Sequence, residues 1–185
     1  MLFIKDKDRF YFIESTKLVI DERKTQQMLI PENMLFFKAK NSKTVIAGDN
    51  FAALDALRYV SLPFPAQLSL PAIHRRVMPK LTAIIEELGR FDEEDNLPVF
   101  FFGKGDKAFG VMNDGGIFEM EDAMTWGWND SYFRYALALT EGMPLMKRIQ
   151  TVYKTVEKVS GTYLFPLIMM DTKNCKIQIV EEETE

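Results

Sequence analysis

The chain contains one cysteine, one histidine and no long apolar run among its 185 residues. The single Cys175 excludes an internal disulfide and a multi-cysteine zinc site, and the single His74 excludes a site built from several histidines. No segment has the apolar length of a membrane span, and the charged residues 5–9 follow too closely on the first residues for a secretory signal. We therefore expect a cytoplasmic protein with no membrane association, no metal and no cofactor.

Basic residues are fewer than acidic ones: 23 lysines and arginines against 27 aspartates and glutamates give a net charge of −4. They are spread along the chain instead of forming a stripe, which argues against a nucleic-acid partner. Hydrophobic residues make up 47% of the chain, enough for one sizeable core, and 185 residues do not require a second. We predict one domain at residues 1–180, followed by an acidic tail at residues 181–185.

Short apolar stretches bounded by turn residues predict a protein rich in antiparallel strands. Strands are predicted at residues 1–5, 10–16, 34–40, 44–48, 99–103, 107–112, 117–121, 163–170 and 176–180. The first four form two hairpins, which we expect to share one sheet, and the next three form a meander. Helical spacing is found at residues 50–60, 72–88, 131–139 and 144–159. Pro79 lies inside the second helix and is expected to kink it or to end its first turn.

Two parts of this pattern point to a known family. The meander that begins at Val99 leads through a Gly-Trp-Asn-Asp turn at residues 127–130 into a helix, and the strand Lys43–Gly48 leads into the helical segment Asn50–Val60. Their order and spacing, over nearly the whole chain, resemble the bacterial HslV peptidase and proteasome β-subunit family. The resemblance implies an α+β fold, a four-layer αββα sandwich of two antiparallel sheets flanked by helices, as in N-terminal-nucleophile hydrolases. It also implies a homo-oligomer.

The family's catalytic residue is an N-terminal threonine whose own α-amino group is the general base. Counting from the start of the first strand, Met1 takes this place, and a thioether is not a nucleophile. The family's lysine has only Lys38 near its position, and the family's aspartate aligns around Thr16, with Asp21 as a shifted alternative. Trp128 stands where the family has the serine of Gly-Ser-Gly. We therefore predict a degenerate site at Met1, Thr16 and Trp128, with no catalytic residue.

Two functional hypotheses stay open. The first is a proteasome- and HslV-like subunit, from a bacterial or phage genome, that has lost its threonine-peptidase site and serves as an oligomeric structural or binding component. Its candidate binding residues are Trp128, Asn129 and Asp130, and a further protein partner is one expected association. The second is an active peptidase or amidohydrolase that uses a non-standard nucleophile, Ser15 or Thr16.

Four single residues have simple interpretations. His74, beside two arginines, is expected to be a surface helix residue because it lacks partners that would tune it for catalysis. Trp126 is expected to pack in the core, whereas Trp128 either plugs the old site or contacts a partner. Gly127 is expected to be required because the turn leaves no room for a Cβ.

Overall fold

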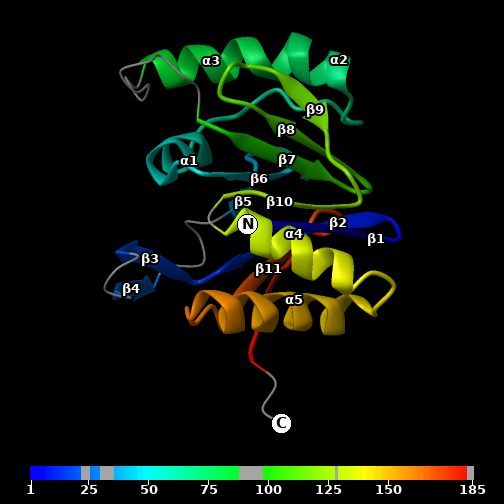
Figure 1. Ribbon diagram of the computed structural model, residues 1–185. Helices are drawn as coiled ribbons and strands as arrows, with labels where there is room; N and C mark the ends of the chain where they lie inside the picture. The colour runs from blue at the N-terminus through cyan, green and yellow to red at the C-terminus, as the bar shows by residue number, and fades with distance from the viewer. Residues whose placement is uncertain (22–25, 30–35, 88–97, 128, 183–185) are drawn as a thin grey trace.

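The computed structural model describes residues 1–21, 26–29, 36–87, 98–127 and 129–182. Within these residues, two five-stranded antiparallel sheets pack face to face, and helices cover both outer faces (Figure 1). The structure confirms the four-layer α+β sandwich that the resemblance implies. No helix in the described part of the chain is long and apolar enough to cross a bilayer.

The first sheet has the strand order β10-β1-β2-β11-β12, and the second has the order β5-β6-β7-β8-β9. The strands of the first sheet are β10 (Ala123–Thr125), β1 (Leu2–Asp6), β2 (Arg9–Ser15), β11 (Leu167–Asp171) and β12 (Ile177–Val180). Those of the second sheet are β5 (Phe36–Lys38), β6 (Val45–Gly48), β7 (Phe100–Lys104), β8 (Lys107–Val111) and β9 (Ile117–Glu119). A separate hairpin joins β3 (Lys17–Asp21) to β4 (Gln26–Leu29).

The prediction that the two N-terminal hairpins share a sheet was wrong. The β1–β2 hairpin belongs to the first sheet, where β2 pairs with β11, and the β5–β6 hairpin belongs to the second, where β6 pairs with β7. These pairings join segments that are far apart in the chain, so they cannot be predicted from turn residues, which act only on their neighbours. Prediction also missed β3, β4 and the three-residue β10, which pairs with β1 and carries the chain from the second sheet to the first.

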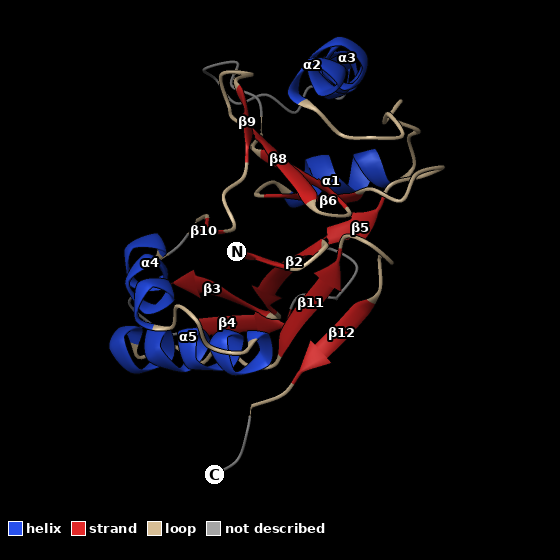
Figure 2. Ribbon diagram, turned by 90° about the vertical axis from the view of Figure 1, so that its right-hand side faces the viewer, coloured by secondary structure: helices blue, strands red, loops and turns tan. Residues whose placement is uncertain are grey.

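Each outer face of the sandwich has its own pair of helical segments (Figures 1 and 2). The second sheet is covered by α1 (Phe51–Arg58) and by a continuous stretch of α2 (Leu70–Ala72), the π-helical turn η2 (Ile73–Val77) and α3 (Met78–Glu87). The first sheet is covered by α4 (Asp130–Leu139) and α5 (Leu145–Ser160). The side chain of Asn50 caps the N-terminus of α1 by accepting a hydrogen bond from the Ala53 N–H at 2.9 Å.

Pro79 does not end the helix, but an irregular turn lies directly before it. The irregular turn is η2, directly before it, where the Met78 N–H donates to the carbonyl of Ile73, five residues back. A wider turn at this point accommodates a residue that has no N–H and whose ring would crowd the preceding carbonyl. The helix therefore continues through Pro79 to Glu87.

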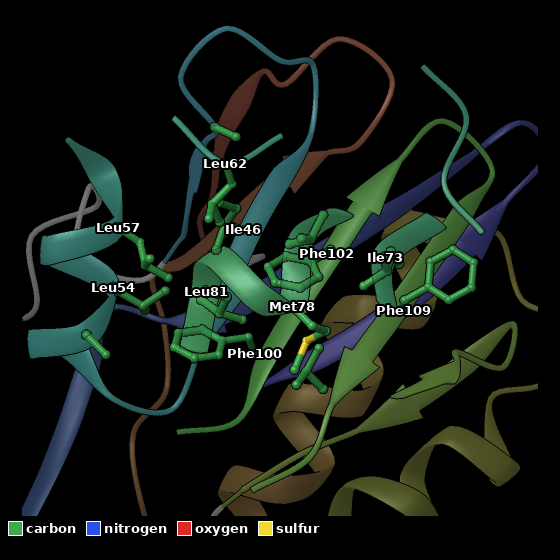
Figure 3. Packing of buried hydrophobic residues seen from close by; sticks show 14 of the residues in the cluster. Ile46, Leu54, Leu57, Leu62, Ile73, Met78, Leu81, Phe100, Phe102 and Phe109 are labelled. Atoms are coloured by element: carbon green, nitrogen blue, oxygen red, sulfur yellow. The ribbon is translucent and has the colours of Figure 1, made fainter. Parts of the chain in front are cut away.

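Strand β7 shows why the apolar run at 99–103 has no polar alternation. Phe100 and Phe102 face α1 and α3, where they pack with Leu54 and Leu81 (Figure 3). Phe101 points the opposite way, into the core between the two sheets. A strand covered on both faces must be apolar at every position.

The core between the sheets is built from aromatic rings of both. Phe3 lies at its centre, fully buried, with ring centroids 4.9 Å from Phe12 and 4.6 Å from Phe101. The sheets lie close together at Gly103, where an added Cβ would collide with Cγ2 of Thr172 and lie 2.8 Å from Cζ of Phe12. Contact between the two sheets therefore requires a residue without a side chain at position 103.

Candidate functional site

Met1 lies where strands of the first sheet meet the open edge of the inter-sheet core. Its α-amino group donates a 2.8 Å hydrogen bond to the Trp126 carbonyl and forms a 2.7 Å ion pair with Oε2 of Glu14. Its carbonyl accepts a 2.9 Å hydrogen bond from the Trp126 N–H. The Met1 side chain is only 7% exposed and packs against the inter-sheet core.

Strand register explains this arrangement. In the first hairpin Leu2 pairs with Ile13, so that Glu14 falls opposite residue 1. On the other side of β1, Leu2 pairs with Thr125, which brings Trp126 beside Met1. The amino group is thus held from both neighbouring strands, by a charged side chain on one and a backbone carbonyl on the other.

Asp49 joins the second sheet to this group of residues. It follows β6, and its Oδ1 accepts a 3.0 Å hydrogen bond from the Val99 N–H. The carboxylate also accepts a hydrogen bond from the Trp126 side chain, whose indole N–H is its only donor. The Asp49 side chain is exposed, but partial desolvation raises the pKa of its carboxyl group, and the two hydrogen bonds oppose this rise only in part.

The raised pKa of Asp49 predicts a pH-dependent contribution to stability. A carboxyl whose pKa is higher in the folded state contributes most when protonated, and this contribution is lost as the pH rises through the folded pKa. The free energy of unfolding of the wild type, relative to Asp49→Asn, should therefore fall as the pH rises from the ordinary value of 3.8. Urea titrations over a pH series measure it, with the exposed Asp106→Asn as the control. A difference that grows in favour of the wild type with rising pH would contradict the prediction.

Ser15 and Thr16, the alternative nucleophiles, are both buried and hydrogen-bonded to the backbone. The Ser15 hydroxyl donates to the Leu164 carbonyl at 2.6 Å and accepts from the Lys17 N–H at 3.0 Å. The Thr16 hydroxyl donates to the Pro166 carbonyl at 2.8 Å. These contacts fix the end of β2 against the segment that leads into β11, and no described contact brings a base to either hydroxyl.

Among the described residues, neither Asn129 nor Asp130 forms a hydrogen bond or an ion pair with Met1. Trp128 lies outside the described residues. Asn129 begins α4 with a left-handed backbone (φ 58°), and its amide nitrogen is enclosed, with no hydrogen-bond acceptor in the described part of the chain. Asp130 accepts a hydrogen bond from the Thr125 hydroxyl and forms a 2.6 Å ion pair with Arg134, so it ties α4 to β10.

Two positions where the family's supporting residues were sought lie elsewhere. Lys38 is exposed on β5 and acts electrostatically on Cys175. Asp21 ends β3 in the separate hairpin. The remaining single residues follow expectation: His74 is an exposed residue of η2, and Trp126 is half-buried, with its ring centroid 5.8 Å from that of Phe101.

The reason given for Gly127 was wrong. No described atom lies within 4 Å of the place where a Cβ would stand, so space is available. The backbone angle is what requires glycine, because φ is +99°, a region that residues with a Cβ rarely adopt.

Gly127→Val should therefore destabilise the protein through backbone strain. We expect a loss of about 1–3 kcal/mol, or roughly 2–12 °C in the melting temperature for a chain of this size. Gly127→Ala should lose a comparable amount, because strain at φ depends on having a Cβ more than on its size. Thermal denaturation followed by circular dichroism measures both. A loss seen with valine alone would indicate crowding, and two unchanged melting curves would show a permissive turn.

The chemistry available around Met1 is limited. The described residues place a thioether, two carboxylates and an indole together, with no hydroxyl or thiol beside the amino group. In the same part of the chain, no cluster of three or more His, Cys, Asp or Glu side chains is arranged to hold a metal ion. Among the described contacts of this group, none pairs a hydroxyl or thiol with a base, which is the pair that acyl transfer needs.

Sequence comparisons find no relative: no protein-family model matches the chain, and no curated protein does. Structure comparison finds BPH from Thiobacillus denitrificans in complex with epoxomicin, at 14% identity and a TM-score of 0.70, covering 95% of this chain and 98% of that one. Anbu, the ancestral beta-subunit, from Yersinia bercovieri has 13% identity and a TM-score of 0.61, with 98% and 87% covered. HslV from Trypanosoma brucei has 11% identity and a TM-score of 0.55, with 98% of both chains covered.

Together with the four layers described above, these likenesses establish the fold class. It is the proteasome-like, N-terminal-nucleophile hydrolase fold. More particularly, the fold is shared with HslV, Anbu and BPH, which confirms the resemblance seen in the sequence. At these identities the likeness concerns the fold alone.

Sequence reasoning missed Glu14 and Asp49. Glu14 could have been predicted from the sequence. A tight turn that pairs Asp6 with Arg9 also places residue 14 opposite residue 1. Asp49 could not, because it meets Trp126 only through the packing of two sheets.

Proposed function

We propose that this chain is a proteasome- and HslV-like subunit that has lost its threonine-peptidase site and serves as a structural or binding component of a homo-oligomer. A cytoplasmic location in a bacterial or phage system is part of this proposal. Its support is the fold together with the residues around Met1.

The observation that carries the proposal is the state of Met1. The reaction needs a hydroxyl on residue 1 and a neighbouring amine free to take its proton. Met1 supplies a thioether, and its amino group is held in an ion pair with Glu14 and a hydrogen bond to Trp126. Asn129, with its enclosed amide nitrogen, and the neighbouring Trp128 and Asp130 are the proposed binding residues.

The alternative is an active hydrolase that uses Ser15 or Thr16. Both hydroxyls donate to backbone carbonyls and are buried, which argues against nucleophilic attack on a substrate. Releasing either residue as a new N-terminus would also remove β1, whose Phe3 lies at the centre of the inter-sheet core.

Activity and covalent labelling test the lost site. The purified chain should not hydrolyse fluorogenic peptides and should form no adduct with epoxomicin, the compound in the BPH structure, and its intact mass should begin at Met1. BPH from Thiobacillus denitrificans serves as the positive control for epoxomicin binding. Turnover that disappears in Ser15→Ala or Thr16→Ala, or an adduct on either residue, would establish the alternative.

Assembly is tested separately by size-exclusion chromatography with light scattering. A homo-oligomer gives a mass that is a multiple of the 21.4 kDa chain. A monomeric mass at micromolar concentration would contradict the assembly part of the proposal and leave the lost site unaffected.

A further inference from the structure

Strand β12 forms one edge of the first sheet and lies at the outside of the molecule (Figure 2). Ile177 and Ile179 of this strand are 41% and 53% exposed. They pair with Met170 and Ile168 of β11, whose side chains belong to the core between the sheets, so the two isoleucines lie on that same face of the first sheet. Since both remain exposed, no described part of the second sheet covers them fully. The edge therefore leaves two apolar side chains in water.

The hydrogen bonds to β11 determine which backbone groups of β12 are left for a further strand. The Asp171 N–H donates to the Lys176 carbonyl at 3.1 Å, so these two residues form a hydrogen-bonded pair. Hydrogen-bonded and non-hydrogen-bonded pairs alternate along an antiparallel ladder. Gln178 therefore also bonds to β11, whereas the N–H and carbonyl groups of Ile177 and Ile179 point to the open edge. Such an edge is a template for another strand.

One register lets β12 pair with β12 of a second copy. In an antiparallel arrangement with a two-fold axis at Gln178, Ile177 of each copy lies opposite Ile179 of the other. Both of these residues have backbone groups that point to the edge, so each pair exchanges its two N–H···O hydrogen bonds. Gln178 lies opposite its own copy as a non-hydrogen-bonded pair, because its backbone groups are already bonded to β11. The hydrogen-bond pattern of the fold and the symmetry of the pair therefore agree.

The side chains on both faces of this paired edge also match. On one face, the isoleucines of the two copies lie side by side and form one continuous apolar row. On the other face, Lys176 lies diagonally across from Glu182 of the second copy, within reach of a long side chain. Both are exposed, and none of the ion pairs in the described part of the chain includes either. A two-fold contact requires a surface that is complementary to itself in this way, whereas a strand of a different protein does not.

We propose that β12 pairs with β12 of a second copy of this chain, antiparallel and with the two-fold axis at Gln178. The first sheets of the two copies then join into one continuous sheet. The backbone hydrogen bonds set the register, and the isoleucines supply apolar area that leaves water. This inference rests on the proposed homo-oligomer and names a surface that holds two copies together.

A cross-link tests the axis. Residues of a non-hydrogen-bonded antiparallel pair have Cα atoms about 4.5 Å apart, which is within the range of a disulfide. Gln178→Cys, in a Cys175→Ser background, should therefore form an intermolecular disulfide under mild oxidation. The matched control is Lys176→Cys in the same background, another exposed residue two positions earlier. Its two copies lie roughly 14 Å apart across this axis, too far for a disulfide, so the control should stay uncoupled.

Loss of one edge hydrogen bond tests the pairing of the strands. Ile179→Pro removes an N–H that points outward, so the first sheet keeps its own hydrogen bonds while a second copy loses a donor and meets the proline ring. Self-association should weaken by about tenfold or more. Ile179→Val keeps the N–H and an apolar side chain and should associate as the wild type does. Sedimentation velocity over a concentration series measures both variants, and their melting temperatures show whether each is folded.

Failure of this inference differs from failure of the proposed assembly. If the wild type is an oligomer and Gln178→Cys cross-links no faster than Lys176→Cys, the chain assembles through another surface and the β12 contact is wrong. A folded Ile179→Pro variant of unchanged affinity leads to the same conclusion, and if this variant does not fold, the cross-link alone decides. If the wild type is monomeric at every concentration tested, the assembly proposal itself fails, and the β12 contact fails with it.

Discussion

Replacing Phe3 with alanine should lower the free energy of unfolding by about 3–5 kcal/mol, one of the largest losses that a single substitution produces in this fold. Phe3 is fully buried, and its ring contacts Phe12 within its own sheet and Phe101 of the other. The substitution leaves a cavity between two sheets that are held apart by other aromatic residues, so the space cannot close fully.

Thermal and urea denaturation measure this effect. For a chain of this size the melting temperature should fall by roughly 6–20 °C. The matched control is Tyr59→Ala, an aromatic residue after α1 that is mostly exposed, and it should change the free energy of unfolding by less than about 0.5 kcal/mol. Equal effects at the two positions would mean that the sheets do not pack through Phe3.

Gly103→Ala should also destabilise the protein, by about 1–3 kcal/mol. Here the cause is crowding of the core, whereas Phe3→Ala leaves a cavity. The new methyl group would be forced against the methyl group of Thr172 and the ring of Phe12, between the two sheets. Thr172 cannot turn away at low cost, because its hydroxyl donates a hydrogen bond to the Gly105 carbonyl and accepts one from the Phe10 N–H at 2.9 Å.

A second substitution separates crowding from other effects of alanine at this position. Thr172→Ser removes the methyl group that the new Cβ would meet and keeps the hydroxyl, so it should recover part of the stability lost in Gly103→Ala. A double-mutant cycle by urea denaturation gives the coupling energy between the two positions. Additive effects, with no recovery, would show that the two positions do not crowd each other.

Local chemistry predicts much of this fold. The hairpin at β1–β2, the meander β7–β9 and the helices α4 and α5 follow from turn residues and apolar spacing, both of which depend on neighbours in the chain. The membership of each sheet does not, because it is decided by pairings such as Leu167 with Ser15. The short strand β10 has three residues, too few for a period to be recognised.

The candidate site, like the fold, can be predicted from the sequence only in part. The absence of a hydroxyl at Met1 is visible in the sequence, and the partner Glu14 follows from the register of one tight hairpin. Asp49 and Trp126 meet through contacts between elements that are distant in the chain. The positive φ of Gly127 could not be predicted from the sequence either, because glycine adopts many backbone angles and the fold determines which one.

The position of β11 in the first sheet has a consequence for how the protein forms during its synthesis. This strand pairs with β2 on one side and β12 on the other, and its residues 167–171 are made long after those of β2. Until they leave the ribosome, β2 has an unpaired edge, and the apolar faces of the first hairpin lack much of their cover. A nascent chain with an open strand edge and exposed phenylalanines is prone to pair with another chain. Completion of the first sheet therefore waits until β11 has been made, and the nascent chain is most prone to aggregate in the long interval before that.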